Sequence, residues 1–524
     1  MGNLAGGLPF PANFPFNDLN LSLVSPTSLS SLGDASPESA GSKTSISIQR
    51  HTQGLNSVRR IDLDTALQYS GSQGYPALYA WLRKLANTVY HPNIPYEGGA
   101  DILISGGSAD GLWKIYELLF NHWDKDLNDV RDREGLIVEE FVYGPPIAQI
   151  KPRDVNIVPV KMDAEGMLAY GTGGLHDVLQ DWDPAQGKRP HVVYIIPTGQ
   201  NPTSGVLSFS RRKELYEICS TFDLVMIEDD PYWNLYYPST QSISVKYRGA
   251  PTSTNFPTSP NYNYCTQTLE GKSTGYQFLD ELVPSFLSID TDGRVIRLDS
   301  FSKTIAPGCR LGWITAQPSV CEQLFRITDS TTQPPSGVVQ AIVAQLIGDF
   351  GSSDTTGAPD VGASDLSIGW GVQGWIHWLE GLRITNERRM MTMATILEEN
   401  RFVESESGQT EMFSFNWPMG GMFLWVRVNI VNHPLASSID PKRLMLALWI
   451  SCTQHPYRIL TVPGQDFAAN EVIAATDGHF WAIQDAEAVD YILREEDAFE
   501  PGNEGAGDDA ELDREVIENW GSTA

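Results

Sequence analysis

The sequence contains little cysteine. The five cysteines in 524 residues are scattered without a C-x-x-C pair, at Cys219, Cys265, Cys309, Cys321 and Cys452. A sparse, odd set of this kind excludes a disulfide scaffold and a site that binds metal through thiolates. We therefore expect no metal and a reducing compartment inside the cell, with the cytoplasm as the simplest location.

Basic residues are also scarce. Lys and Arg number 36 against 65 Asp and Glu, so the formal net charge is −29. Because such a surface repels nucleic-acid phosphates and anionic membranes, we expect neither as a partner. The amino terminus has no basic stretch before an apolar run, and no segment reaches the roughly 18 to 20 apolar residues that span a membrane. Hydrophobic residues make up 41% of the chain, enough for a large core.

Short apolar runs alternate with longer amphipathic segments between Ile61 and Pro318. This pattern is typical of a sheet covered by helices on both faces, so the predicted fold class is α/β. In one covering helix, Leu215 and Ile218 share a face after a candidate cap at Ser210. The expected strands contain residues 102–104, 136–138, 155–158, 192–196, 224–227, 295–298 and 313–314.

Shifts in composition divide the chain into five parts. We expect a flexible arm (1–50), a segment that joins the small domain (51–94), a large domain (95–350), a smaller domain (375–494) and an acidic disordered tail (495–524). An aperiodic insertion, 238–284, is either a functional flap or a disordered loop. The smaller domain is predicted to contain a helix over 375–400 and a strand over 422–426.

One segment places a lysine directly after a strand: VIRLDS is followed by FSKTIAPGCRLG, which contains Lys303. A lysine at the carboxyl end of a buried strand loses part of its hydration, which lowers its pKa and frees the neutral amine to attack an aldehyde. Ser300, Ser302 and Arg310 would donate hydrogen bonds to one phosphate. The alternative is a surface lysine beside a polar turn.

Two further polar segments follow apolar strands. EDDPY places Asp229 and Tyr232 after LVMI, and PTGQNPT presents the Asn201 amide after VVYII. Because open α/β sheets bind ligands at the carboxyl ends of their strands, these side chains and Lys303 would share one site. Taken singly, a structural cap at Asp229 and a turn former at Asn201 are the alternatives.

In order and spacing, PTGQNPTSG, EDDPYW and SFSKTIAPGCRLGW resemble the signature segments of the fold-type I pyridoxal-phosphate aminotransferases. The sequence is most similar to the aromatic, kynurenine and α-aminoadipate branch, and within it to the fungal aromatic aminotransferases. The resemblance runs from about Ala66 to about Ala469. It implies a large cofactor-binding domain whose mostly parallel, seven-stranded sheet is covered by helices, and a smaller α+β domain.

The resemblance assigns roles to single residues. Lys303 matches the lysine that binds pyridoxal phosphate covalently and then moves a proton between substrate and cofactor as base and acid. Asp229 matches the carboxylate that keeps the pyridine nitrogen protonated. Tyr232 and Asn201 match the groups that hydrogen-bond the ring O3′, and Tyr143 matches the aromatic side chain that stacks on the ring.

Phosphate binding is implied for a further segment. GGSADG resembles the turn and helix start at which backbone N–H groups and the Ser108 hydroxyl hold the phosphate. Ala109 stands where relatives often have Gln, so its contact would come from the backbone alone. Tyr69 matches a tyrosine that reaches the phosphate of the neighbouring subunit, which implies a homodimer. The alternative for Tyr69 is an ordinary loop aromatic.

The sequence departs from the family at the substrate carboxylate. Relatives hold this group with an arginine in a segment of the type Y-L-R-x-S-F, and the two-pronged ion pair orients the Cα–H bond. Here Trp481-Ala482-Ile483-Gln484-Asp485 stands in its place, and Arg494 lies further on, in a segment expected to form a helix that faces away. Three explanations compete for this difference. They are divergence to another substrate or another carboxylate anchor, a weakened catalyst, and a gene-model error near Phe480.

The leading hypothesis is an aminotransferase that works in two half-reactions between an amino acid and a 2-oxo acid. The resemblance implies aromatic amino acids or 2-aminoadipate as donors, 2-oxoglutarate as acceptor and a role in fungal biosynthetic metabolism. Two rivals stay open. One is a lyase or decarboxylase with the same cofactor, and the other is a catalytically weakened cofactor-binding protein whose function survives the loss of Lys303.

Overall fold

The computed structural model describes residues 7–29, 44–52, 57–58, 60–93, 98–257, 259, 262–348, 369–405, 408–433, 435–455, 457–477 and 479–484. All of them belong to one structural unit, which spans Met1–Asp485. The predictions made for Arg494 and for the acidic tail 495–524 concern residues outside the described ranges.

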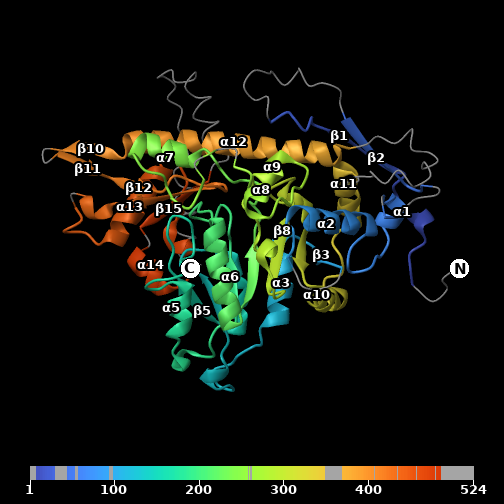
Figure 1. Ribbon diagram of the computed structural model, residues 1–524, viewed down its shortest axis with the longest axis horizontal. Coiled ribbons are helices and arrows are strands. Elements are labelled where there is room, and N and C mark those ends of the chain that lie inside the picture. The colour runs from blue at the N-terminus through green and yellow to red at the C-terminus, as the bar shows by residue number, and fades with distance from the viewer. Residues whose placement is uncertain are drawn as a thin grey trace, which may run out of the picture. The chain divides into compact units, whose positions relative to one another are not determined.

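Seven strands form the central sheet. In spatial order they are β3 (Asp101–Ser105), β9 (Gly312–Ala316), β8 (Val295–Ser300), β7 (Val225–Asp229), β6 (Val192–Ile195), β4 (Gly135–Glu139) and β5 (Asn156–Val160). Figure 1 labels β3, β8 and β5. The pairs β8-β7, β7-β6, β6-β4 and β4-β5 are parallel, whereas β9 runs antiparallel to both of its neighbours. The prediction of a mostly parallel, seven-stranded sheet is therefore confirmed.

Both faces of this sheet are buried, as the near-continuous apolar runs indicate. In β4, Ile137 packs into one hydrophobic cluster, while Leu136 and Val138 pack into a second. The first cluster includes side chains of α2 (Pro76–Val89), α6 (Phe209–Phe222) and α11 (Gly337–Ile347), and the second those of α3 (Ser108–Leu119) and α10 (Pro318–Ser330). Shorter helices are α1 (Leu63–Ala66), α4 (Gly144–Ile150) and α5 (Leu175–Gln180).

The covering helix predicted after Ser210 is α6, but its cap lies two residues earlier. The Ser208 hydroxyl accepts a hydrogen bond from the Arg211 backbone N–H at 3.3 Å. The extended backbone at Ser208 places its side chain beside the free N–H groups of the first turn, and Ser210 already lies inside the helix. Leu215 and Ile218 are buried, as predicted.

Two segments without a helical period contain regular structure. Within 1–50, β1 (Asp18–Leu23) and β2 (Thr44–Gln49) form an antiparallel pair. Within 238–284, three helices form: α7 (Thr240–Arg248), α8 (Tyr264–Thr268) and α9 (Gln277–Asp280). The buried residues of α7 are polar, which explains the missing apolar pattern; they are Thr240, Gln241 and Ser244.

A second sheet follows the long helix α12 (Gly371–Asn400), drawn in orange in Figure 1. Its strands, in spatial order, are β12 (Phe413–Phe415), β13 (Phe423–Val428), β15 (Phe480–Gln484) and β14 (Val462–Pro463). Further elements of this region are β10 (Phe402–Ser405), β11 (Gly408–Glu411), α13 (Pro441–Thr453) and α14 (Glu471–Asp477). The expected helix over 375–400 and strand over 422–426 correspond to α12 and β13.

Two glycines let the second sheet approach the central one. Gly199, in the turn after β6, has φ +58°, and a Cβ on it would lie 2.3 Å from the Cα of Gly421, just before β13. This contact brings the start of β13 beside the end of β6. Among the described residues, no helix has both the length and the apolar character required to cross a lipid bilayer.

Candidate active site

A cavity of about 430 Å³ lies at the carboxyl ends of β6, β7 and β8. It gathers every residue predicted to bind the cofactor except Tyr69. These are Ser108, Ala109, Tyr143, Asn201, Asp229, Tyr232, Ser300, Ser302, Lys303 and Arg310.

Strand direction explains this convergence. Asp229 is the last residue of β7, Lys303 follows the end of β8 by three residues, and Asn201 stands in the turn after β6. Since neighbouring parallel strands end at the same edge of a sheet, three segments far apart in sequence deliver polar side chains to one place. Ser108 begins α3 and Tyr143 immediately precedes α4.

The Asp229 carboxylate has one bonded and one free oxygen. Its side chain is almost completely buried, and Oδ2 accepts a hydrogen bond of 2.7 Å from the Tyr194 hydroxyl. Oδ1 is buried and has no hydrogen-bond partner among the described residues. Burial raises the pKa of Asp229 to about 6, and the hydrogen bond from Tyr194 opposes this rise. Because an unpaired buried oxygen is costly, Oδ1 is suited to a cationic donor inside the cavity.

Lys303 is half-buried in the cavity, and burial lowers the pKa of its amino group. In the described part of the chain, no carboxylate forms an ion pair with it. Its Nζ lies 5.8 Å from the centroid of the Tyr232 ring. Burial raises the pKa of the Tyr232 phenol, which therefore stays protonated and can donate a hydrogen bond. Lys303 and Tyr232 therefore combine an amine that readily becomes a neutral nucleophile with a neutral hydrogen-bond donor.

A second set of polar groups in the cavity is suited to bind an anion. Ser300 Oγ donates to Ser302 Oγ at 2.8 Å, and the buried Ser108 hydroxyl has no partner among the described residues. Gly107, with φ +105°, precedes α3, and a Cβ on it would lie 3.0 Å from Arg310 Nη2. The missing side chain thus lets the guanidinium lie against a helix start, where free N–H groups attract a phosphate.

Besides aliphatic side chains, prolines and one glutamine, the rest of the cavity wall contains an aromatic part that was not predicted. Phe423 of β13 and Phe467 line the cavity. Phe467 also belongs to a cluster with Phe141 and Trp425, and its ring lies edge-on to Trp425 at 5.8 Å between centroids. The sequence marked Phe423 only as part of an apolar strand, and it gave no signal for Phe467, which lies in a 3₁₀ turn.

β15 is the segment that stands in place of the family's arginine-bearing strand. Its buried Ala482 pairs with Trp425 of β13 and belongs to the same aromatic cluster. Among the described residues, Lys303 and Arg310 are the only positively charged side chains that line the cavity. An arginine for the substrate carboxylate is therefore not contributed by β15.

Tyr69 lies outside the cavity. It follows α1, and 75% of its side-chain surface is exposed. Tyr143, by contrast, lines the cavity while 44% exposed, as expected for a ring at an opening. Within one chain, Tyr69 therefore contributes nothing to the site.

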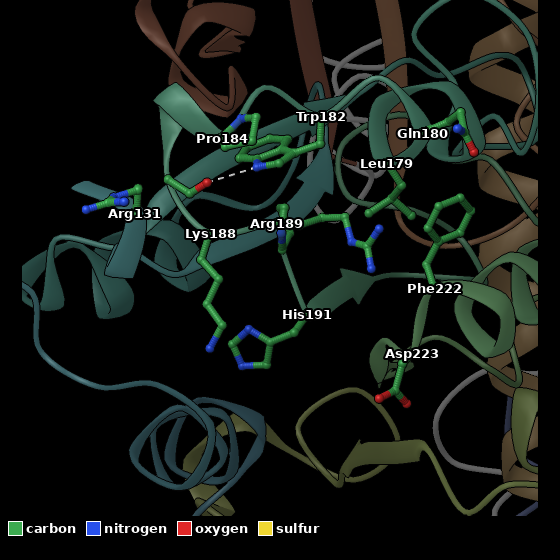
Figure 2. A pocket seen from close by; sticks show the side chains of 12 residues that line it. Arg131, Leu179, Gln180, Trp182, Pro184, Lys188, Arg189, His191, Phe222 and Asp223 are labelled. Carbon is green, nitrogen blue, oxygen red and sulfur yellow. Dashed lines mark hydrogen bonds between the residues drawn. The ribbon is translucent and has the colours of Figure 1, made fainter. Parts of the chain in front are cut away.

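A larger cavity, of about 610 Å³, lies at the amino ends of β6 and β7 (Figure 2). His191 and Asp223, which line it, stand just before these two strands, and Trp182 Nε1 donates to the Gly187 carbonyl at 3.0 Å. This cavity contains none of the predicted site residues. Size favours it, but the shifted pKa values of Asp229 and Lys303 and the unpartnered Oδ1 of Asp229 favour the smaller cavity as the site of chemistry.

The model of the family described as "Aminotransferase class I and II" matches residues 49–471. The chain belongs to the class I and II aminotransferases. An aromatic amino acid aminotransferase of Schizosaccharomyces pombe is 29% identical over 89% of this chain and 82% of its own length. An L-tyrosine:2-oxoglutarate aminotransferase of Tapinella panuoides is 31% identical over 82% of this chain and 69% of its own.

A solved structure is similar as well. The crystal structure of the aminotransferase Aro8 from Candida albicans superposes with a TM-score of 0.72, at 27% identity, over 94% of this chain and 90% of that one. The fold-type I assignment is thereby confirmed, and with it an aminotransferase that uses pyridoxal phosphate.

The cavity fits pyridoxal phosphate on three counts. The hydroxyls and the guanidinium beside the start of α3 suit its phosphate, the free Oδ1 of Asp229 suits its pyridine nitrogen, and the half-buried amine of Lys303 suits its aldehyde. Among the described residues, Ser108 Oγ and Asp229 Oδ1 have no hydrogen-bond partner, and burial lowers the pKa of Lys303, so the cofactor explains features that are otherwise costly.

Proposed function

We propose that this aminotransferase moves the amino group of an aromatic amino acid to 2-oxoglutarate or a similar 2-oxo acid. The observation that carries the proposal is the assembly of Lys303, Asp229 and the phosphate-binding groups in one cavity. The names of the relatives, one an aromatic amino acid aminotransferase and one an L-tyrosine:2-oxoglutarate aminotransferase, support the substrates. Phe423 and Phe467 support the same choice, because an aromatic substrate gains from contact with an aromatic wall.

When bound, pyridoxal phosphate supplies an aldehyde that captures the substrate amino group and a ring that withdraws electrons from the substrate α-carbon. We propose that Asp229 Oδ1 holds the pyridine nitrogen and that Tyr143 covers one face of the ring. Tyr232 and Asn201 hydrogen-bond the ring O3′. The groups that hold the phosphate are Ser108, the backbone N–H of Ala109, Ser300, Ser302 and Arg310.

Lys303 is the residue that moves the proton. Its neutral amine, favoured by burial, takes the proton from the substrate α-carbon, and its ammonium form returns a proton to the carbon of the cofactor aldehyde. Among the described residues, the cavity offers the substrate carboxylate no cationic side chain besides Lys303 and Arg310.

We also propose a homodimer in which Tyr69 reaches the cofactor phosphate of the neighbouring subunit. Tyr69 is 75% exposed, and Phe10 is 67% exposed. The chain segments that carry them are in contact, because the Gln68 side chain donates a 2.8 Å hydrogen bond to the Pro9 carbonyl. An exposed aromatic surface of this kind is suited to an interface.

The proposed setting is biosynthetic metabolism in the cytoplasm. All five cysteines are unpaired, and three of them are buried, which is typical of proteins in a reducing compartment. The fungal relatives support a role in the metabolism of aromatic amino acids.

The first half-reaction tests the proposed function. Protein loaded with pyridoxal phosphate is mixed with tyrosine, phenylalanine, 2-aminoadipate or alanine, and the visible absorbance band of the cofactor is followed. We expect the band to disappear fastest with tyrosine and phenylalanine, with release of the matching 2-oxo acid, and Lys303→Ala to release none. Release of CO2 or ammonia would favour the lyase or decarboxylase, and an unchanged band with every donor would contradict the proposal.

A further inference from the structure

The structure pairs Asp229 with a buried tyrosine that the sequence did not single out. Tyr194 lies in β6, opposite Ile227 of β7, and is fully buried. Its hydroxyl donates to Asp229 Oδ2 at 2.7 Å. Tyr194 does not line the cavity. Any effect on the cofactor therefore passes through the Asp229 carboxylate.

We propose that Tyr194 is a positioning residue, whose hydrogen bond keeps Asp229 ionised and leaves Oδ1 free to pair with the cofactor nitrogen. The inference rests on the proposed function, because it takes Asp229 as the partner of that nitrogen. It adds a residue that makes no contact with the cofactor cavity itself.

Two physical effects act in opposite directions on Asp229. Burial favours its protonated form, which cannot form an ion pair with a pyridinium. A hydrogen bond donated to the carboxylate favours the ionised form. Burial also raises the pKa of Tyr194, so the phenol remains a donor over the whole neutral range. The bond to Oδ2 further limits rotation of the carboxylate, which keeps Oδ1 on the cavity side.

Among the groups that lower the pKa of Asp229, Tyr194 has the largest effect, followed by Ser108 and Arg297. Several residues either shift the pKa of Asp229 or have their own pKa shifted by its charge. They are Ser108 and Tyr116 of α3, Tyr194 of β6, the neighbouring Asp230, Tyr232, and Arg297 of β8. Arg297 lies 3.0 Å from Asp230, so these two charges largely offset each other. Of this set, Tyr194 alone donates a hydrogen bond to Asp229 that satisfies ordinary geometry in the described residues.

Tyr116 provides a matched control. It is 1% exposed, and the charge of Asp229 acts on it as well. Its hydroxyl has no hydrogen-bond partner among the described residues. Tyr116→Phe therefore removes the same group at the same depth without removing a bond to Asp229.

The test measures binding of pyridoxal phosphate to apoprotein from pH 5 to 9, by quenching of tryptophan fluorescence, in wild type, Tyr194→Phe, Tyr116→Phe and Asp229→Asn. We expect wild-type affinity to fall below about pH 6, where Asp229 becomes protonated. Because a hydrogen bond to a charged group is among the stronger ones, Tyr194→Phe should move this midpoint upward by about one to two pH units and weaken binding at pH 6.5 about tenfold. Tyr116→Phe should follow wild type.

A double variant separates this role from a purely structural one. In the Asp229→Asn background, Tyr194→Phe should weaken binding no further. An unshifted midpoint, or the same loss in both backgrounds, would overturn the inference on Tyr194 while leaving the proposed function intact. Asp229→Asn that binds the cofactor as tightly as wild type would contradict the proposed function and this inference together. Thermal unfolding of each apoprotein verifies that the variants are folded.

Discussion

Replacing Gly107 with alanine tests the account of phosphate binding. Gly107 has φ +105° and ψ 174°, a region that residues other than glycine hardly enter, at a cost of about 1–3 kcal/mol. The new Cβ would lie 3.0 Å from Arg310 Nη2 and 3.5 Å from Arg310 Cζ. Because these atoms are the far end of a flexible side chain, the guanidinium would swing away from the helix start.

The expected magnitude follows from these two effects. Loss of a charge-assisted hydrogen bond to the phosphate costs about 1.5–3 kcal/mol, which corresponds to a fall in cofactor affinity of about tenfold to a hundredfold. The strained backbone should lower the free energy of unfolding of the apoprotein by about 1–3 kcal/mol. Fluorescence titration with pyridoxal phosphate measures the first quantity, and urea unfolding measures the second.

Gly308→Ala is the control for this variant. Gly308 lies two residues before Arg310 in a 3₁₀ turn, and a Cβ on it would meet no atom within 4 Å. We expect this variant to bind the cofactor within about twofold of wild type, since it adds neither strain nor a clash. The reasoning is refuted if Gly107→Ala binds pyridoxal phosphate as tightly as wild type, or if Gly308→Ala loses as much affinity.

Two further predictions concern buried charge. Burial raises the pKa of Glu139 from 4.5 to about 8, so the folded chain holds an extra proton between these values and loses stability as the pH rises through them. Glu139→Gln should remove this loss, which amounts to roughly 5 kcal/mol at pH 9. Equal urea midpoints for both proteins at pH 9 would contradict this. Arg297→Met removes a buried guanidinium that forms ion pairs with three carboxylates, so it should lower the free energy of unfolding by about 3–5 kcal/mol. A loss below about 1 kcal/mol would contradict this. Among the described residues, Asp230 and Asp299 would lose their ion-pair partner, and Glu228 would keep only Arg212, at 3.8 Å.

The strands of the large sheet could be predicted because their signals are local. Each is a near-continuous apolar run, and a polar side chain just after such a run must lie at the edge of the sheet. Lys303 and Asp229 were located by this argument, and the structure brings both into one cavity. The aromatic wall had no such signal, since Phe467 reaches the cavity from a turn that follows β14.

Contacts between distant residues leave no local pattern. Tyr194 bonds Asp229 across 35 positions, and in the sequence it is one more apolar residue of β6. The helix α7 was missed because its buried face includes Gln241, whose side chain donates to the Met419 sulfur at 3.5 Å instead of packing as an apolar residue. The pair β1 and β2 was missed because its alternation lies within a segment rich in Pro and Ser.

Reduction with borohydride measures the central claim most directly, that Lys303 carries the cofactor in the cavity beside Asp229. Protein loaded with pyridoxal phosphate is reduced and digested, and the modified peptide is identified by mass spectrometry. We predict a single pyridoxyl label, on Lys303, and no label in Lys303→Ala. A label on another lysine, or a chain that stays unlabelled, would contradict the account.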